Sequence, residues 1–188
     1  EPDFGFVLDS MVIADGGTIH ASSLCAPRVE PEIAFRLNRP LRGPDVTIEE
    51  VLDATDSVAA ALEIVDSRIE DWRITLVDTI ADNASSGAIV LGPWVPIQEV
   101  PDLREVASHL FVNDVPVESG DGSAVLGHPA AAVAWLANTL STFGGSVDAG
   151  QLVMSGSMTA AVRLHPGDLA VADLPGLGRV SVTVLGKD

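Results

Sequence analysis

Three glutamates, Glu30, Glu32 and Glu63, have the residue type and the spacing of a metal-binding carboxylate cluster. Residues i and i+2 of a strand point to the same face, so a strand through this segment would place Glu30 and Glu32 side by side. Pro31 lies between them and cannot donate a ladder hydrogen bond, which favours an edge or a strand start that faces a cleft. Taken alone, this pair is also typical of a solvated acidic edge, because acids are mostly exposed.

Glu63 changes that balance because it lies in the apolar run 59–65. An unpaired carboxylate in such surroundings costs on the order of several kcal/mol. A hard cation such as Mg²⁺ or Mn²⁺ takes oxygen ligands and would neutralise a cluster of three carboxylates. The sequence has no His/Cys array with zinc spacing. We therefore predict an oxygen-only site in which Glu30, Glu32 and Glu63 hold a divalent cation.

The elements that must position these residues are mostly strands. The patterning predicts helices at 47–61, where Thr47 and Glu50 form a capping box, and at 130–143, where His128 and Pro129 precede the first turn. Strands are expected between Gly, Pro and Asp turns at 5–13, 32–37, 88–91, 109–112, 151–155, 169–174 and 178–185. No long linker interrupts the chain, so residues 1–188 are predicted to form a single catalytic domain.

Composition excludes several functional classes. The net charge of −17, from 10 basic and 27 acidic residues, argues against binding to a phosphate backbone. No apolar run approaches the roughly 18 to 20 residues of a membrane span, and the single cysteine, Cys25, is typical of a reducing compartment, so we expect a cytoplasmic protein. The only lysine is Lys187, which leaves the body of the chain without a Schiff-base or P-loop lysine.

An ordered set of motifs resembles a known family. The motifs are Arg28-Val29-Glu30-Pro31-Glu32-Ile33-Ala34, Ala61-Leu62-Glu63-Ile64-Val65-Asp66-Ser67-Arg68-Ile69 with Trp72, Asp82-Asn83-Ala84-Ser85-Ser86, and Leu126-Gly127-His128-Pro129. Together they resemble the hydratase and decarboxylase branch of the fumarylacetoacetate hydrolase superfamily. The resemblance covers essentially the whole chain.

The resemblance implies a fold, an assembly and ligands. It implies an α+β fold, a strand-dominated mixed β-roll with a few flanking helices, and assembly as homo-oligomers. Its metal ligands, a Glu-x-Glu pair and a later Glu, map onto Glu30, Glu32 and Glu63. Asp3, in Pro2-Asp3-Phe4-Gly5, matches a family position near the substrate and is a candidate acid/base group. Family members carry a further N-terminal segment with a lysine, so we expect that the native chain is longer than this one.

The implied activity is the hydration of 2-hydroxypenta-2,4-dienoate (2-oxopent-4-enoate) to 4-hydroxy-2-oxopentanoate. This step belongs to meta-cleavage catabolism of aromatic or steroid-ring compounds, where the next aldolase or the sister decarboxylase would be a partner. The alternatives are a 4-oxalocrotonate (2-oxo-3-enedioate) decarboxylase, a C–C hydrolase of acylpyruvates and, in a different class, an inactive assembly partner. A decarboxylase must place a second carboxylate, and no additional arginine is unmistakable for this, with Arg68 and Arg163 unplaced. We therefore favour the hydratase.

Other polar residues are weaker candidates. Ser85, Ser157 and Thr159 could donate hydrogen bonds to the substrate, although ordinary turn residues are an equally good interpretation. Asp82 and His128 are further candidates for the acid/base group. However, Asp82 is typical of a structural turn, and His128 before Pro129 is typical of a helix start.

Overall fold

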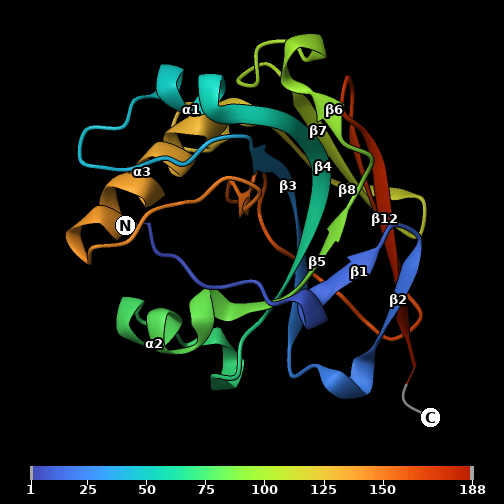
Figure 1. Cartoon of the computed structure of the whole chain (residues 1–188). Coiled ribbons are helices and arrows are strands. Elements are labelled where there is room, and N and C mark those ends of the chain that lie inside the picture. Colours follow the sequence, from blue (N-terminus) through green and yellow to red (C-terminus); the bar gives the residue numbers. More distant parts are fainter. Residues whose placement is uncertain (1, 187–188) are drawn as a thin grey trace.

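The computed structural model describes residues 2–186 and contains two β-sheets that pack against each other, with the helices gathered on one side of them (Figure 1). The helices are α1 (Ile48–Ala54), α2 (Leu76–Ala81) and α3 (Pro129–Thr142). The strands are β1 (Val12–Ala14), β2 (Gly17–His20), β3 (Pro27–Leu37), β4 (Thr55–Asp66), β5 (Ser86–Leu91), β6 (Val95–Pro96), β7 (Ala107–Val112), β8 (Val115–Asp121), β9 (Leu152–Met154), β10 (Val162–Arg163), β11 (Leu169–Leu174) and β12 (Gly178–Leu185). Within the described residues, no helix is long and apolar enough to cross a membrane.

The first sheet has the order β1-β5-β4-β3-β10, with β6 paired to β4 and β9 paired to β3. The second has the order β2-β12-β11-β7-β8. Both sheets are mixed, because β1 runs parallel to β5 and β2 runs parallel to β12 while their other pairs are antiparallel. The chain therefore has the strand-dominated mixed architecture that the sequence predicted.

The long pair β3 and β4 separates the core from the site. Val29, Ile33 and Phe35 of β3 are fully buried in the core that both sheets share. Because side chains alternate across a strand, the intervening residues point to the opposite face of the sheet. Glu30 and Glu32 lie on that opposite face, away from the second sheet.

The predicted helix 47–61 is wrong beyond its first two turns. Its start is confirmed, since Thr47 and Glu50 form the expected capping box. The helix ends at Ala54, and the following residues enter β4, which pairs with β3 on one side and with β5 on the other. Ala59, Ala60 and Ala61 are fully buried there. Their small side chains favour a helix locally, but they also allow both faces of a central strand to be covered closely, and the tertiary pairing decides.

Among the other predicted strands and helices, some are confirmed by the structure and others are wrong or were missed. The strands 169–174 and 178–185 and the helix after His128 are confirmed. The predicted strand 5–13 is largely wrong, because residues 2–8 form no helix or strand, a 3-10 turn follows at Asp9–Met11, and β1 begins only at Val12. The short strands β2, β6 and β10 and the edge strand β8 were not predicted, because their sequences lack clear alternation.

Candidate metal centre

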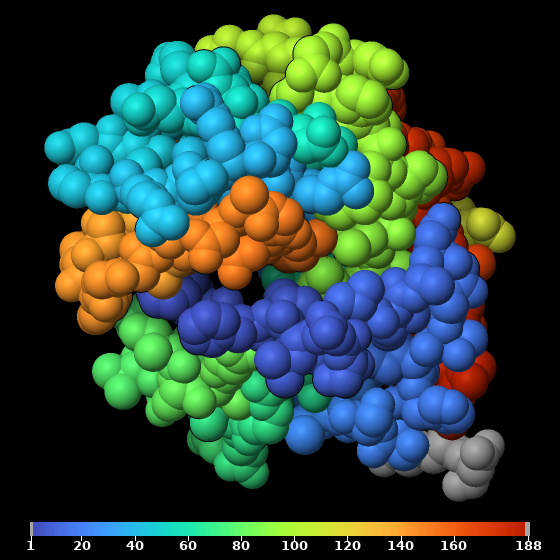
Figure 2. Space-filling model, viewed as in Figure 1, coloured from blue at the N-terminus to red at the C-terminus, as the bar shows by residue number. Residues whose placement is uncertain are grey.

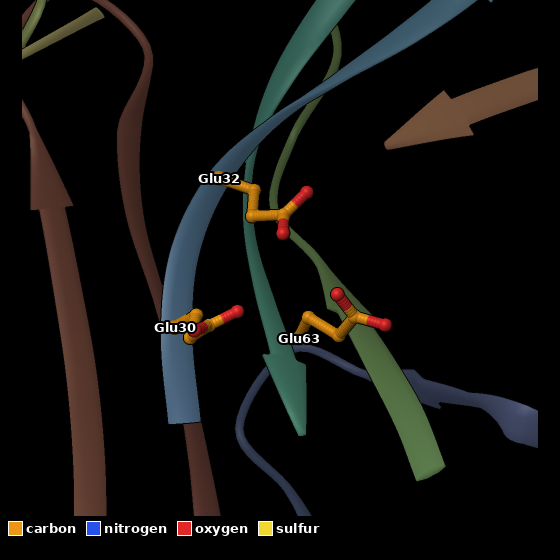
Figure 3. A group of neighbouring side chains, drawn as sticks. All are labelled: Glu30, Glu32 and Glu63. Carbon is orange, nitrogen blue, oxygen red and sulfur yellow. The ribbon is translucent and has the colours of Figure 1, made fainter. Parts of the chain in front are cut away.

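The three glutamates meet on the face of the first sheet that points away from the core. Glu30 of β3 lies directly opposite Glu63 of β4 in the strand register, and Glu32 lies two residues further along the same face. One carboxylate oxygen from each residue lies within 4.8 Å of the others. Figure 3 shows the three side chains converging from the two strands. The structure thus brings together the residues that the sequence predicted as ligands.

The cluster is buried so deeply that ionisation of its carboxyl groups is unfavourable. Glu32 is 1% exposed, and its Oε2 accepts a hydrogen bond of 2.8 Å from the backbone N–H of Gly156. Burial, and then the charge of Glu63, raise the pKa of Glu30 to about 7. Burial also raises the pKa of Glu63, and burial with the neighbouring carboxylates raises the pKa of Glu32 well above its ordinary value. A positive charge placed among them would remove this conflict.

These residues fit a hard divalent cation. They supply only carboxylate oxygens, which Mg²⁺, Mn²⁺ and Ca²⁺ prefer, and all three converge from two rigid neighbouring strands. The backbone N–H of Gly156 fixes the Glu32 carboxylate from outside the cluster, as partners of metal ligands commonly do. Within the described residues, a search for acidic, histidine and cysteine side chains that lie close enough together to hold an ion finds these three glutamates.

The glutamates line a large cleft of about 1170 Å³. One wall is the N-terminal segment, residues 2–9, another is α3, and a third is the stretch from Gly150 to Ser157. Figure 2 shows the molecule hollowed between the orange segments, which comprise α3 and the stretch after it, and the N-terminal segment, in dark blue. A small molecule can therefore reach the glutamates from solvent.

Asp3, the predicted acid/base group, also lines the cleft, and its negative charge contributes to the raised pKa of Glu63. The segment that carries it is held by Asn83. The side-chain Oδ1 of Asn83 accepts from the Phe6 N–H at 2.8 Å, and its Nδ2 donates to the Phe6 carbonyl at 2.9 Å. Gly5 passes so close to Asn83 that an added Cβ would lie 2.5 Å from the Asn83 carbonyl oxygen. Asn83 therefore positions Asp3, a role that the sequence did not reveal.

The predicted hydrogen-bond donors have different environments. Ser157 lines the cleft, but its hydroxyl donates to the Thr159 carbonyl and accepts from the Thr159 N–H. Ser85 and Thr159 are not among the lining residues. Ser86, which the sequence did not single out, lines the cleft, and its buried hydroxyl lies against the Glu63 carboxylate, where it opposes the rise in the pKa of Glu63. The roles of Ser85, Ser157 and Thr159 stay predictions.

Asp82 and His128 make the structural contacts that the sequence favoured. Asp82 accepts hydrogen bonds from the N–H and guanidinium of Arg68 and so closes the loop that follows β4. The Nδ1 of His128 accepts from the Ala130 N–H and caps the N-terminus of α3. Neither residue is among those that line the cleft.

The chain is similar to proteins of known activity. The family model described as "Fumarylacetoacetate (FAA) hydrolase C-terminal" matches residues 1–185. The 2-hydroxyhexa-2,4-dienoate hydratase of Comamonas testosteroni is 48% identical over 97% of this chain and 70% of its own length. The 2-keto-4-pentenoate hydratase of Paraburkholderia xenovorans is 47% identical over 96% of this chain and 67% of its own length. A solved 4-oxalocrotonate decarboxylase from Pseudomonas putida G7, complexed with magnesium and adipate, is 39% identical with a TM-score of 0.94 over 96% of this chain and 69% of that one.

Proposed function

The chain belongs to the fumarylacetoacetate hydrolase family, and on this premise we propose that it is a divalent-metal-dependent hydratase of 2-hydroxypenta-2,4-dienoate and close homologues. The observation that carries the proposal is the cage of Glu30, Glu32 and Glu63 at the base of an open cleft that Asp3 also lines. The product is 4-hydroxy-2-oxopentanoate when the substrate has five carbons. The enzyme is then a hydro-lyase.

Glu30, Glu32 and Glu63 hold the cation, which we propose is Mg²⁺ or Mn²⁺ because both prefer carboxylate oxygens. When bound, the cation supplies Lewis-acid stabilisation of negative charge on the 2-oxygen of the substrate. The Gly156 N–H holds the Glu32 carboxylate in place, and Glu63 faces Glu30 across the strand pair. The rigid sheet keeps the three carboxylates in position through the reaction.

Asp3 is the proposed acid/base residue. Its carboxylate takes the proton of the 2-hydroxyl and delivers a proton to C5 of the dienol, which yields an enone and leaves Asp3 as it began. Water then adds its hydroxyl at C4 and a proton at C3, so dienol and water combine without loss of any atom. A positioned acid/base group of this kind contributes roughly 10²- to 10⁴-fold to the rate. Asn83 keeps Asp3 at the wall of the cleft through its two hydrogen bonds to Phe6.

The second candidate is a 4-oxalocrotonate decarboxylase, because the solved decarboxylase shares the fold over nearly this whole chain. The comparisons favour hydration, because the two hydratases are 48% and 47% identical to this chain and the solved decarboxylase is 39% identical. Within the described residues, the walls of the cleft contain no lysine, arginine or histidine that could neutralise the second carboxylate of an enedioate. Homo-oligomeric assembly, a cytoplasmic location and cooperation with the next aldolase of the pathway remain part of the proposal.

The deciding experiment compares two substrates with Mg²⁺ present. We expect 2-hydroxypenta-2,4-dienoate to be hydrated and 2-oxohex-3-enedioate to release little CO₂. Rapid CO₂ release without hydration would reverse the assignment. Glu32→Gln is expected to lower both cation binding and turnover, the latter by about 10²- to 10³-fold, as loss of a charge-stabilising group commonly does. The conservative control is Glu99→Gln on an exposed turn. If Glu32→Gln left binding and turnover unchanged, the cage would be wrong.

A further inference from the structure

The β4–β5 strand pair ends in a β-bulge that turns Ser86 toward the metal centre. In the strand register, Ile64 lies opposite Ala88. The next residue of β4, Val65, lies opposite Ser86, so β5 has one extra residue at this point. In a regular strand Ser86 and Ala88 would share a face, and Ala88 faces the core. The bulge instead brings Ser86 to the wall of the cleft, where its hydroxyl lies against the Glu63 carboxylate.

Arg68 joins the two strands beyond this bulge. Its Nη1 donates to the carbonyl of Asp66, the last residue of β4, at 2.5 Å. The same Nη1 donates to the carbonyl of Ser86, the first residue of β5, at 3.3 Å. Both acceptors lie at strand ends, where the ladder between β4 and β5 stops. The guanidinium therefore holds the bulge, and with it the direction of Ser86.

The same guanidinium fixes the turn that precedes β5. Its Nε donates to Oδ1 of Asp82 and its Nη2 donates to the Asp82 carbonyl, both at 2.5 Å. The backbone N–H of Arg68 donates to Oδ2 of Asp82 at 3.0 Å. Asp82 is followed by the left-handed residues 83–85, of which Asn83 holds Phe6 through two hydrogen bonds. One side chain thus determines where both Asn83 and Ser86 lie.

These contacts require an arginine rather than any cation. A guanidinium carries five N–H donors in a rigid plane, whereas a lysine carries its donors on one nitrogen and cannot reproduce this fork. The Arg68 side chain is 39% exposed, so it does not fill the hydrophobic core. Arg68 is also not among the described residues that line the cleft. Its contacts are therefore made with the two segments, and not with the core or the substrate.

From this geometry we propose that Arg68 is a positioning residue for both halves of the site. Through Asn83 it holds the segment of Asp3 at the cleft. Through Ser86 it holds the Glu63 carboxylate in the direction of the cation. This inference rests on the proposed function, because Asp3 and Glu63 are the acid/base group and a cation ligand of that proposal. It predicts that one conservative substitution outside the cleft changes catalysis and cation affinity together.

The test variant is Arg68→Lys, which keeps the charge but loses the fork. Hydrogen exchange measured by NMR reports how often the Phe6 N–H opens, and we expect its exchange to be about tenfold faster. At saturating Mg²⁺, kcat should fall by about tenfold, as in Asn83→Ala. Mn²⁺ affinity, measured by electron paramagnetic resonance, should fall by about tenfold or more, because loss of a partner of a metal ligand commonly has an effect of this size.

Two single variants separate these effects. Asn83→Ala should speed exchange at Phe6 and lower kcat, but keep the Mn²⁺ affinity. Ser86→Ala should lower the Mn²⁺ affinity and keep the exchange rate at Phe6. The matched control is Arg73→Lys, because Arg73 lies in the same loop and its side chain is 68% exposed. It should keep the wild-type exchange, kcat and Mn²⁺ affinity, and changes equal to those of Arg68→Lys would overturn the proposal.

A loss of folding would give a different pattern from a loss of positioning. The number of Mn²⁺ sites per chain reports the folded fraction, whereas their affinity reports the geometry of the cage. We expect Arg68→Lys to keep the number of sites and to lower their affinity. In the double variant with Asn83→Ala, exchange at Phe6 should be no faster than in Asn83→Ala alone, because both substitutions act through one contact. Multiplied effects on exchange, or an unchanged Mn²⁺ affinity in Arg68→Lys, would overturn the proposal.

The failure of this inference can be separated from the failure of the proposed function. If Arg68→Lys changes exchange at Phe6 and Mn²⁺ affinity as expected, but the wild type does not hydrate 2-hydroxypenta-2,4-dienoate, the hydratase assignment is wrong and the positioning role stands. If the wild type hydrates the dienoate and Arg68→Lys matches it in kcat and Mn²⁺ affinity, the positioning role is wrong and the hydratase stands.

Discussion

Glu30→Gln should stabilise the metal-free protein at neutral and alkaline pH. In the folded chain, burial and the charge of Glu63 raise the pKa of Glu30 from 4.5 to about 7. The folded state therefore holds a proton between these two values that the unfolded state has released. Since stability falls with pH wherever the folded state binds more protons, the free energy of unfolding should decrease as the pH rises from 4.5 to 7. The difference corresponds to about 3 kcal/mol above pH 7.

The substitution removes this cost because glutamine is uncharged at every pH. We expect Glu30→Gln to be more stable than wild type by about 3 kcal/mol at about pH 8 and nearly equal to it below pH 4.5. The loss of this charge also relieves the neighbouring Glu32 carboxylate, whose pKa the charge of Glu30 helps to raise. Stabilities of single domains are roughly 5 to 15 kcal/mol, so the effect is large enough to measure.

The assay is urea unfolding followed by circular dichroism at several pH values between about 4.5 and 8, at one protein concentration and with EDTA present. Glu99→Gln, on an exposed turn, controls for the loss of one surface charge. With Mg²⁺ at about 1,000 times its dissociation constant the order should reverse, since such a ligand adds about 4.1 kcal/mol to a protein that binds it, which exceeds the difference of about 3 kcal/mol. If wild type and Glu30→Gln had parallel pH profiles in EDTA, the argument that burial destabilises this carboxylate would be refuted.

Three further predictions concern the cation and the group that positions the acid. Because the pKa values of Glu30, Glu32 and Glu63 are all raised, cation binding should release protons. The affinity for the cation should therefore fall as the pH falls below 7, by about tenfold per pH unit for each proton released. Calorimetry in buffers of different ionisation enthalpy measures this release, and the prediction is wrong if no protons are released. Asp3→Asn should lower kcat by about 10²- to 10⁴-fold while Mn²⁺ affinity is kept, and an unchanged kcat would remove Asp3 from the mechanism. Asn83→Ala frees the N-terminal segment and should lower kcat by about tenfold through the loss of two hydrogen bonds. Its Mn²⁺ affinity should stay close to wild type, so a lower Mn²⁺ affinity in Asn83→Ala would contradict a role limited to positioning Asp3.

The members of the glutamate cluster could be predicted from the sequence, whereas their geometry could not. The same-face relation of Glu30 and Glu32 is local, because it follows from the two-residue repeat of any strand. Glu63 was selected for its apolar surroundings. Its position opposite Glu30 depends on the register between β3 and β4, and the start of β4 was mistaken for helix because the run of alanines has a strong local preference. The choice of cluster survived this error because it relied on burial rather than on secondary structure.

The ends of helix α3 could be predicted from the sequence, whereas the surroundings of its side chains could not. Its boundaries follow from local signals, namely His128 and Pro129 at its start and two glycines after its end, and the structure confirms them. Its apolar composition is typical of a buried helix, and one face is buried in the core. Which remaining side chains face a cleft depends on how the helix sits against distant segments. A tryptophan in an apolar helix is typical of a core residue, but Trp135 lines the cleft against Phe4.

The turn at the start of β5 shows why the sequence cannot tell which of two adjacent serines lines the cleft. Asn83, Ala84 and Ser85 all adopt positive φ values, of 56°, 55° and 56°, which residues with side chains rarely do in succession. This tight turn places the Asn83 amide against Phe6 and leaves Ser85 outside the cleft lining, while Ser86 starts β5 beside Glu63. The direction of side chains in such a turn cannot be predicted from the helical or the strand repeat. Asn83, the first of these three residues, makes the two hydrogen bonds that hold the segment of Asp3 at the cleft, so this left-handed turn also determines where the proposed acid lies.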